Sequence, residues 1–544
     1  MFKNTYKGTC TAYITFICLL VISLIGCSSA PTPSTNEAGK SNSLEPQKGG
    51  TLTIAEIAEP DTLDPHKTSI STGSSISGYM GGSLVTFDPV TNKLQPYLAE
   101  SYTASEDGKT ITFKIRTGVK FHDGTPLTAA SFKASYERAL APETASPIAA
   151  QLLSSIKSIS APDDTTLIFH LDKPAAPLLP YLTSEGYTQP LSIDAIKKYG
   201  KEYGRNPVGI GPWKFESWKT GESITMVRNE EFSWGLPYAE NKGAPRPEKL
   251  VIKFIKDNQT LLAALDSGAI DIATIPGKNA KKYKNNDKFT IIEGTAPVVY
   301  SMEMNLENEF LKDIHVRKAI NLAINKEAII QADLQGEGVP AHGPLPSLMF
   351  GYDPAVEQYG YKYNVEEAKK MLEASGWKEN EQGIREKDGK TLSLSLMAYE
   401  ANPGNQLIQS MLKEIGIDVE IQMFETAAAV DQGLKGAFDL FIYSYGDIDP
   451  DILYLLKHSS QIGVANFGRV NNKELDALLE KGRTTMNEEE RRKSYVDIQK
   501  LDIEQAYGVP LYSPKLFTVV NKRVQGAKLN RMAQLSVYDV WIQQ

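Results

Sequence analysis

Residues 98–129 read LAESYTASEDGKTITFKIRTGVKFHDGTPLTA, and this stretch carries strand, turn and helix signals in close succession. Thr110 to Ile115 alternates polar and apolar side chains, which is the pattern of a half-buried strand. Asp107-Gly108 just before it is a turn signal, so the stretch predicts a β-hairpin with this pair at its tip. Thr128 can cap a following helix, whose apolar residues recur at every fourth position: Phe132, Tyr136 and Leu140.

Strand and helix patterns alternate along the rest of the chain. Strands are expected at residues 51–54, 250–255, 269–273, 298–305, 391–396, 417–423 and 438–443. Helices are expected at residues 259–266, 313–325, 406–415, 473–483 and 488–505, and one more is expected to begin at the capping pattern of Asn364 and Glu367. This alternation predicts an α/β protein.

The N-terminus has the features of an export signal. Lys3 and Lys7 precede an apolar run over residues 11–26, which is too short for a comfortable membrane span but suits a signal peptide. The run ends in Leu24-Ile25-Gly26-Cys27, which resembles a bacterial lipobox and implies cleavage before Cys27 and acylation of its thiol. The alternative is an ordinary signal peptide with an incidental cysteine.

Two further observations fit a lipid anchor. The other cysteines, Cys10 and Cys18, lie within the signal, so the mature chain keeps one thiol and can form no internal disulfide. Residues 28–50 are rich in Ser, Pro, Thr, Asn and Gly, and such a segment cannot bury enough apolar surface to fold. We therefore expect a signal peptide at residues 1–26, and a lipidated cysteine with a flexible tether at residues 27–50.

Length and composition limit the class of protein. A chain of 544 residues exceeds what one hydrophobic core usually supports, so two or more lobes are expected. Its 41% hydrophobic and 23% charged residues are ordinary for a soluble globular protein. The formal net charge of −8 becomes −10 without residues 1–26, which hold two lysines and no acid, and this argues against nucleic acid as a partner.

Catalytic and metal-binding motifs are weak in this sequence. Ser154-x-x-Lys157 and Lys219-Thr220-Gly221 match two elements of penicillin-recognising enzymes, but the third, Ser-Asp-Asn, is missing. The six histidines are scattered, with no pair at metal-ligand spacing, and His170 within a predicted strand is expected to be structural. We therefore expect no enzyme, no cofactor, no catalytic residues and no metal ligands, while a metal or metal chelate held by spatially clustered residues stays open.

Several segments, taken in order, resemble one family. Leu98–Tyr102, Glu106–Phe113 and Val119–Ala129 resemble the signature block of extracellular solute-binding proteins of the dipeptide/oligopeptide/nickel type. Asn206-Pro207-Val208-Gly209-Ile210-Gly211-Pro212-Trp213 resembles the family's Gly-Thr-Gly-Pro-Tyr turn, with Ile210 and Trp213 as departures. Arg228-Asn229 with Trp234, and Val316-Arg317-Lys318-Ala319, resemble later segments. The resemblance covers residues 49–541.

The resemblance implies a two-lobed periplasmic-binding-protein fold of the large, three-subdomain type. One lobe would comprise residues 51–296 with 514–544, the other residues 297–513, and the chain crossings at Ala296-Pro297 and Tyr512–Pro514 would form the hinge. It also implies a monomer that carries a solute to the permease of an ABC importer. With the lipid anchor, it implies a place on the outer face of a cell membrane, in a Gram-positive source.

The resemblance also implies where the ligand binds. In peptide-binding members, an aspartate in a loop matching Tyr443–Asp451 pairs with the α-amino group of the peptide, and Asp447 is the matching position, although this loop is one residue shorter. Tyr445 in the same loop is a second expected contact. The alternative is that Asp447, Asp449 and Asp451 only form a turn and cap the next helix.

The carboxylate end of a peptide has no obvious partner. Dipeptide-binding members carry an arginine in the loop that corresponds to residues 398–404, but this loop has no Arg or Lys here. Arg469 is a candidate substitute, and a surface salt bridge is the alternative for it. Longer peptides and amino-bearing non-peptides therefore remain candidate ligands, beside a nickel ion or metal chelate for the same kind of importer and a signalling receptor without transport.

Overall fold

The computed structural model describes residues 45–530 and 532–544. Cys27 and the predicted signal peptide, with most of the predicted tether, lie outside the described residues. Residues Pro46–Gln544 form one compact unit. Within the described part of the chain, no helix is both long enough and apolar enough to cross a membrane.

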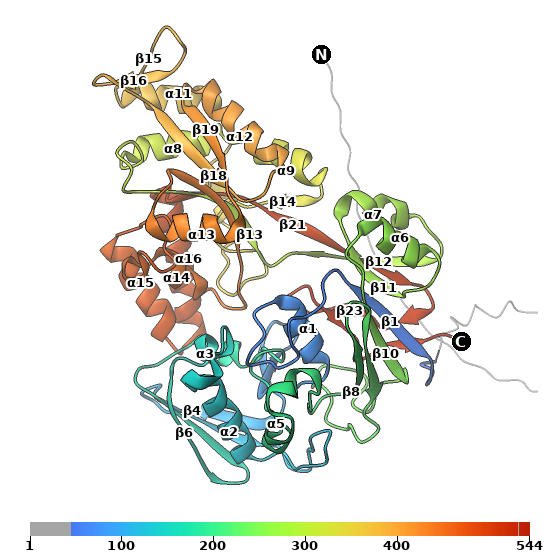
Figure 1. Ribbon diagram of the computed structural model, residues 1–544. Coiled ribbons are helices and arrows are strands. Elements are labelled where there is room, and N and C mark those ends of the chain that lie inside the picture. Colours follow the sequence, from blue (N-terminus) through green and yellow to red (C-terminus); the bar gives the residue numbers. More distant parts are fainter. Residues whose placement is uncertain (1–44, 531) are drawn as a thin grey trace, which may run out of the picture. The chain divides into compact units, whose positions relative to one another are not determined.

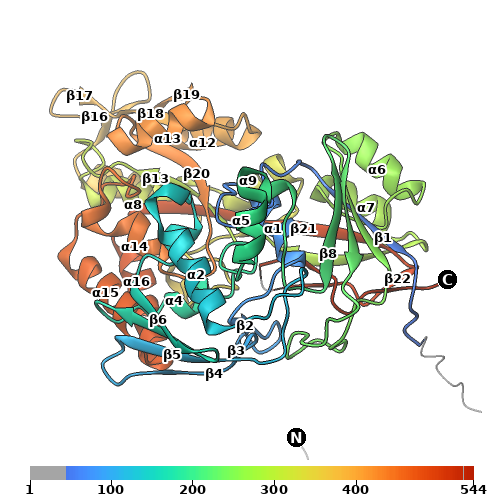
Figure 2. The same cartoon turned by 60° about the horizontal axis from the view of Figure 1, so that its bottom comes forward.

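The hairpin predicted from residues 98–129 is confirmed. Strands β4 (Ala99–Ala104) and β5 (Thr110–Ile115) pair antiparallel on either side of Gly108, whose φ is 65°. They continue into a four-stranded antiparallel sheet of order β4-β5-β7-β6, completed by β6 (Ile156–Asp163) and β7 (Thr166–Leu171). Helix α2 (Ala129–Leu140) starts at Thr128, which forms a capping box with Ser131. It lies beside this sheet (Figure 2). Its apolar face packs there, so that Phe132, Tyr136 and Phe169 share one core.

A large mixed sheet runs through the rest of the molecule (Figure 1). Its spatial order is β19 (Asp418–Met423), β18 (Ser393–Ala398), β20 (Leu440–Tyr445), β13 (Val299–Met304), β21 (Gly508–Asn521), β11 (Ile272–Ile275), β1 (Thr51–Glu56), β10 (Lys249–Phe254), β9 (Ser223–Arg228) and β8 (Trp213–Lys219). Strands β12 (Phe289–Thr295) and β14 (Gly338–Pro340) also pair with β21. Pairs β1/β10, β1/β11, β18/β19 and β18/β20 are parallel, as crossovers through helices require.

Strand β21 joins the two ends of this sheet. Up to Pro514 it pairs with β13 and β14, and from Lys515 onward it pairs with β12 and then β11. The switch is bridged by the amide of Ala296, which donates to the carbonyl oxygen of Pro514 (2.8 Å). One strand therefore belongs to both halves of the sheet, and its partners change at a single proline.

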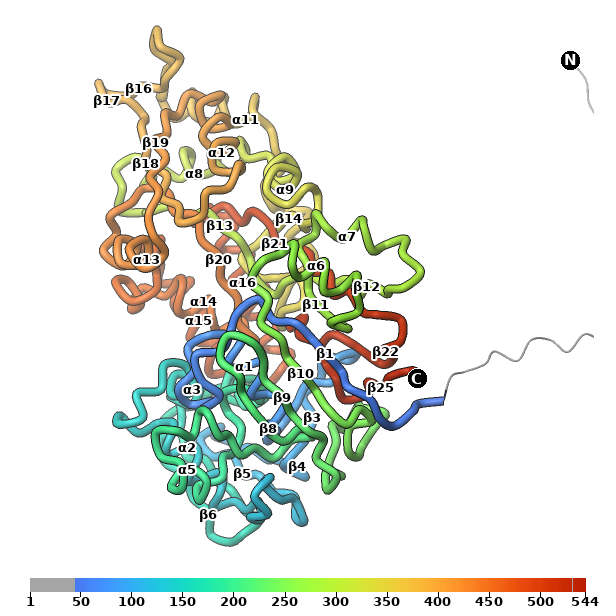
Figure 3. Tube along the Cα trace, turned by 45° about the vertical axis from the view of Figure 1, so that its right-hand side comes forward, coloured from blue at the N-terminus to red at the C-terminus, as the bar shows by residue number. Residues whose placement is uncertain are grey.

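Helices cover the two ends of the large sheet. Helices α6 (Asn258–Asp266) and α7 (Gly277–Lys284) lie beside β11 and β12 (Figure 3) and share a core with them. At the other end α8 (Ile314–Ala323), α9 (Lys326–Leu334), α11 (Val365–Ala374) and α12 (Pro403–Glu414) pack on β13 and β18. Helices α15 (Lys473–Thr484) and α16 (Glu488–Glu504) pack against each other in a further core.

Shorter elements complete the described chain. The helices are α1 (Ser71–Tyr79), α3 (Ala149–Leu152), α4 (Leu178–Tyr181), α5 (Ile193–Tyr199), α10 (Val356–Tyr359), α13 (Thr426–Lys435) and α14 (Ile452–Lys457), with 3-10 turns at Pro142–Thr144, Gly200–Arg205 and Ser459–Gln461. The paired short strands are β2 (Val85–Phe87) with β3 (Leu94–Pro96), β15 (Lys378–Glu379) and β17 (Lys390–Thr391) with β16 (Arg385–Lys387), β22 (Val524–Gln525) with β25 (Trp541–Ile542), and β23 (Lys528–Leu529) with β24 (Leu535–Ser536).

The predicted elements are present, with a few shifted bounds. The strand expected at residues 269–273 is β11, three residues further on, because Ala269 and Ile270 still close the turn after α6 by bonding to Ala264. The helix expected at residues 313–325 is α8, which ends at Ala323, because Asn325 already caps the next helix, α9. Asn364 caps α11 by accepting from the amide of Glu367, as its pattern predicts.

Candidate functional site

One cavity lies among segments that are far apart in the sequence. It has a volume of about 870 Å³ and is lined by the end of β1, the helix α1, the turn at residues 183–187, parts of β11 and β21, and residues 530 and 532–538. One residue from the loop after β20, Ile448, also lines it. The cavity therefore touches the loop in which the sequence predicts a ligand contact, because Ile448 follows Asp447 directly.

Two carboxylates line this cavity. Glu56 ends β1 and Glu185 lies in the turn after α4. Burial raises the pKa of Glu56 to about 7 and the pKa of Glu185 to about 8. Neither side chain forms an ion pair with another described residue, and the described lining contains no Lys, Arg or His. The described lining of this cavity is therefore either uncharged or negatively charged.

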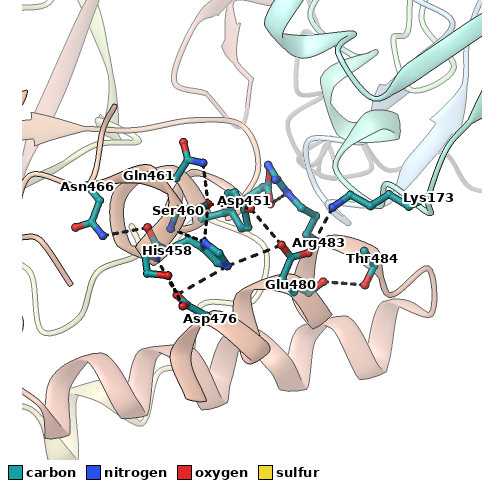
Figure 4. Close-up of polar contacts among 12 residues, drawn as sticks. Lys173, Asp451, His458, Ser460, Gln461, Asn466, Asp476, Glu480, Arg483 and Thr484 are labelled. Carbon is teal, nitrogen blue, oxygen red and sulfur yellow. Dashed lines mark hydrogen bonds and ion pairs between the residues drawn. The ribbon is translucent and has the colours of Figure 1, made fainter. Parts of the chain in front are cut away.

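The loop after β20 carries three aspartates with different surroundings. The Asp449 carboxylate is buried and receives two bonds from the Arg491 guanidinium of α16, at 3.0 and 2.5 Å. The Asp451 carboxylate is paired with the guanidinium of Arg483 on α15, at 2.7 Å (Figure 4). Bidentate arginine pairs of this kind are strong and orienting, so these two aspartates fasten the loop to the helices behind it.

Asp447 differs from both of these neighbours. Its side chain is half-buried, and its Oδ1 accepts a hydrogen bond from the amide of Ile448 (2.6 Å). No Lys, Arg or His among the described residues pairs with it. Burial raises its pKa to about 7, with a smaller contribution from the negative charges of Asp449 and Asp451. Asp447 also lies close enough to raise the pKa of Tyr181, at the end of α4. Asp447 therefore gains its negative charge near neutral pH, and no described cation pairs with it.

The other two predicted contacts are engaged within the protein. The hydroxyl of Tyr445, whose ring is buried, donates to the carbonyl oxygen of Pro344 (2.9 Å). The guanidinium of Arg469 donates to the carbonyl oxygen of Leu434 (3.1 Å), and lies 3.4 Å from a carboxylate oxygen of Glu307. Neither residue lines the cavity. A ligand contact for Tyr445 and Arg469 stays a prediction.

A second set of contacts joins the segment after β7 to α15 (Figure 4). The Lys173 ammonium lies 3.6 Å from the Glu480 carboxylate, and the amide of Ala176 donates to the carbonyl oxygen of Arg483 (2.9 Å). Because Arg483 also holds Asp451, the same side of α15 contacts both the β7 segment and the loop after β20.

Metal-ligating side chains form no metal site in the described part of the chain. No group of three or more His, Cys, Asp or Glu residues there could hold a metal ion. His170 lies in β7, with its Nε2 3.2 Å from the hydroxyl of Ser160, a structural contact of the kind expected for it. Ser154 and Lys157 do not suggest a catalytic pair, since the Lys157 ammonium is bound to Asp172 on an exposed surface.

Comparison with known proteins identifies the family. The model for bacterial extracellular solute-binding proteins, family 5 Middle, matches residues 93–463. The chain belongs to this family. The oligopeptide-binding protein AppA of Bacillus subtilis (strain 168) is 28% identical over 558 aligned residues, which cover 98% of this chain and 99% of AppA. The family resemblance seen in the sequence is therefore confirmed.

Two solved structures of family 5 proteins show the same fold. AppA from Bacillus subtilis in complex with a nonapeptide matches with a TM-score of 0.72 and 27% identity, over 92% of this chain and 100% of the AppA chain. NikZ from Campylobacter jejuni in complex with Ni(L-His) matches with a TM-score of 0.73 and 28% identity, over 90% of this chain and 99% of the NikZ chain. The α/β, two-lobed binding-protein fold is thus confirmed, and the family consists of extracellular solute-binding proteins.

The sequence prediction missed both cavity carboxylates. Glu56 ends a strand that buries Leu52 and Ile54 on one face, and an acid at the end of such a strand was a usable signal. Glu185 lies in Ser184-Glu185-Gly186, which looks like any exposed turn, and no local pattern marks it. Only the approach of α1 and the C-terminal segment encloses it.

Proposed function

We propose that this family 5 protein captures a peptide or peptide-like solute in the 870 Å³ cavity and delivers it to the permease of an ABC importer. The observation that carries this proposal is the Asp447 carboxylate. It is half-buried beside the cavity-lining Ile448, and it lacks the arginine that each neighbouring aspartate has. An ammonium group is the natural partner for such a carboxylate, since a charge-assisted bond would repay its desolvation.

Peptide as the solute is supported by the relatives. AppA is named an oligopeptide-binding protein and was solved with a nonapeptide. In this proposal the α-amino group of the peptide pairs with Asp447, and the peptide extends past Ile448 into the cavity. The missing arginine in residues 398–404 disfavours a strict dipeptide clamp, so we propose peptides longer than two residues.

Lobe closure would enclose the ligand. We propose one lobe of residues 51–296 with 514–544 and a second of residues 297–513, with hinges at Ala296-Pro297 and Tyr512–Pro514. The change in the partners of β21 between Pro514 and Lys515 supports this boundary, because the two parts of the sheet share only that strand there. Few residues need to change their backbone angles for such lobes to move.

Anchoring through Cys27 completes the proposal. A lipid on this thiol would keep the protein at the outer face of the cell membrane, close to its permease, as a Gram-positive cell without an outer membrane requires. Cys27→Ala should release the protein into the medium or leave it unprocessed, as fractionation and intact mass would show. Normal processing with unchanged membrane retention would contradict the anchor.

A metal chelate is the second candidate solute. NikZ, solved with Ni(L-His), supports it. As far as the described residues are concerned, the metal would have to arrive with its own chelating ligand. Such a ligand need not present a free ammonium group, so its binding would not depend on Asp447.

The test compares occupancy by peptides with free and acetylated amino termini. The full-length protein, freed of bound ligand in mild guanidinium and returned to buffer, is mixed with a pool of random tetra- to nonapeptides and examined by native mass spectrometry. Asp447→Asn should lower the affinity for free-amine peptides by about 30-fold or more, since a desolvated charge loses its partner. N-acetylated peptides should bind the parent and the variant equally weakly.

Asp431→Asn is the matched control. It makes the same chemical change at an exposed ion pair with Lys435 on α13, and it should bind like the parent. If Asp447→Asn and the parent bind free-amine peptides equally, Asp447 is only a turn residue. If no peptide binds the parent, peptide capture is wrong.

A further inference from the structure

The charged side chains that line the cavity are all of one sign. Among its described lining residues, Glu56 and Glu185 are the ionisable carboxylates, and no lysine, arginine or histidine is present. Hydroxyl groups of α1 and of the turn before Glu185 add hydrogen-bond acceptors at the same surface: Ser71, Thr72, Ser74, Ser75, Thr183 and Ser184. A surface with acceptors and negative charge suits a ligand group that only donates and carries positive charge.

Glu185 is held in place by its backbone. Its carbonyl oxygen lies against Gly81 just after α1, where a Cβ would approach it to 3.0 Å, and its Cβ faces Gly78, where a Cβ would come within 3.9 Å. Glycines at these two positions let the turn approach α1 closely. The backbone of Glu185 is therefore fixed in the cavity wall, although no described side chain binds its carboxylate.

Aromatic side chains line the same cavity as Glu185. Tyr238 and Tyr538 are among its lining residues, and burial, with a smaller contribution from the charge of Glu185, raises the pKa of both phenols. Tyr97 and Tyr538 also approach each other, with 3.3 Å between their hydroxyl oxygens. A cavity that holds both a carboxylate and tyrosine rings can bind a cation through charge and through the ring faces. Glu56, by comparison, influences one tyrosine, Tyr79.

We propose that the peptide carries a basic side chain, Lys or Arg, and that Glu185 binds its cationic group. This inference rests on the proposed function, because it assigns a second contact to the same ligand. Asp447 would take the α-amino group and Glu185 the side chain, so the site would select cationic peptides rather than peptides in general. A negatively charged protein surface also favours the arrival of such ligands.

A neutral Glu185 offers the competing explanation. Burial raises its pKa to about 8, and the described cavity lining holds no lysine, arginine or histidine that would favour the charged form. Protonated, Glu185 could donate a hydrogen bond to a peptide carbonyl instead. Glutamine can make that bond too but cannot pair with a cation, so Glu185→Gln separates the two roles.

The experiment reads the sequences of the bound peptides. The full-length protein and Glu185→Gln are each incubated at pH 8 with the random peptide pool, and bound peptides are released and sequenced by tandem mass spectrometry. The parent should enrich Lys and Arg over the uncharged methionine by about tenfold or more at one position. Glu185→Gln should lose this enrichment while its total peptide occupancy persists through Asp447.

Two controls make the result decisive. Glu56→Gln makes the same change in the same cavity and should keep the enrichment. A pool with Nε-acetylated lysines should show no lysine enrichment with any protein. If the parent shows no preference, or if Glu185→Gln keeps it, the assignment is overturned while peptide capture stands. If the parent binds no peptide at all, both proposals fall together.

Discussion

Asp447→Asn should make the ligand-free protein more stable at alkaline pH, although it removes a charge from a hydrogen-bonded loop. The parent pKa is raised to about 7, which means that the folded state holds the proton more tightly than the unfolded state does. The stability of the parent therefore falls as pH rises from about 4 to about 7, and stays lowered above that. Asparagine does not titrate, so the variant avoids this loss.

The size of the gain follows from the shift. A rise from 3.8 to about 7 corresponds to an upper limit of about 4 kcal/mol at roughly 1.4 kcal/mol per unit. Because the side chain is only half-buried, solvent screening reduces the measurable gain to about 1–2 kcal/mol. The Ile448 amide keeps an acceptor, since the side-chain oxygen of asparagine can replace Oδ1.

The assay is urea denaturation of parent and variant at pH 4 and pH 8. The two proteins should have nearly the same free energy of unfolding at pH 4, and the variant should be the more stable at pH 8. Reduced stability of the variant at pH 8 would show that the charged Asp447 serves as a helix cap, and would refute its role as a carboxylate reserved for a ligand. Asp431→Asn, at an exposed pair, should change stability by less than about 1 kcal/mol at both values.

Three further predictions follow from the same contacts. Affinity for free-amine peptides should fall as pH drops below about 7, because Asp447 must lose its proton before it can pair with an ammonium. Titration calorimetry in buffers of different ionisation enthalpy should show proton release on binding near pH 6. Binding that does not depend on pH would contradict this. Arg491→Gln should lower the free energy of unfolding by about 3–5 kcal/mol, since Asp449 is left buried without its cation. Lys435→Gln, at an exposed pair, should lower it by less than about 1 kcal/mol. Equal effects of the two variants in urea denaturation would show that the buried pair contributes no more stability than the exposed one. Lys173→Glu places a second negative charge beside Glu480, so the variant should bind peptide a few-fold more weakly. Small-angle scattering should also show a larger radius of gyration for its peptide-bound form. An unchanged radius would mean that this contact does not hold the lobes together.

Local chemistry made much of the fold predictable. Asp107-Gly108 marked the hairpin, and Thr128 and Asn364 marked helix starts, because turns and caps depend on residues close in sequence. Strand β21 was not predicted. Its two prolines, Pro510 and Pro514, interrupt the strand pattern, and they are tolerated because a proline carbonyl still accepts a hydrogen bond, as Pro514 does from Ala296.

The site was less predictable because its contacts are distant in sequence. The loop after β20 shows three aspartates, and beyond the family match of Asp447 no local pattern shows which of them is left without a cation. The distinction comes from Arg483 and Arg491, which lie 32 and 42 positions further along the chain than their partners. Glu185 likewise lines a cavity together with Tyr538 at the C-terminal end. Residue type can suggest such a site, but only tertiary packing shows which charges remain unpaired.

Native mass spectrometry of the protein purified from its own host would show which solute the cavity carries. Without any added ligand, we expect a series of mass additions that fragment as peptides longer than two residues, with free amino termini and a Lys or Arg in common. A single discrete addition with the isotope pattern of a metal or its chelate would contradict peptide capture.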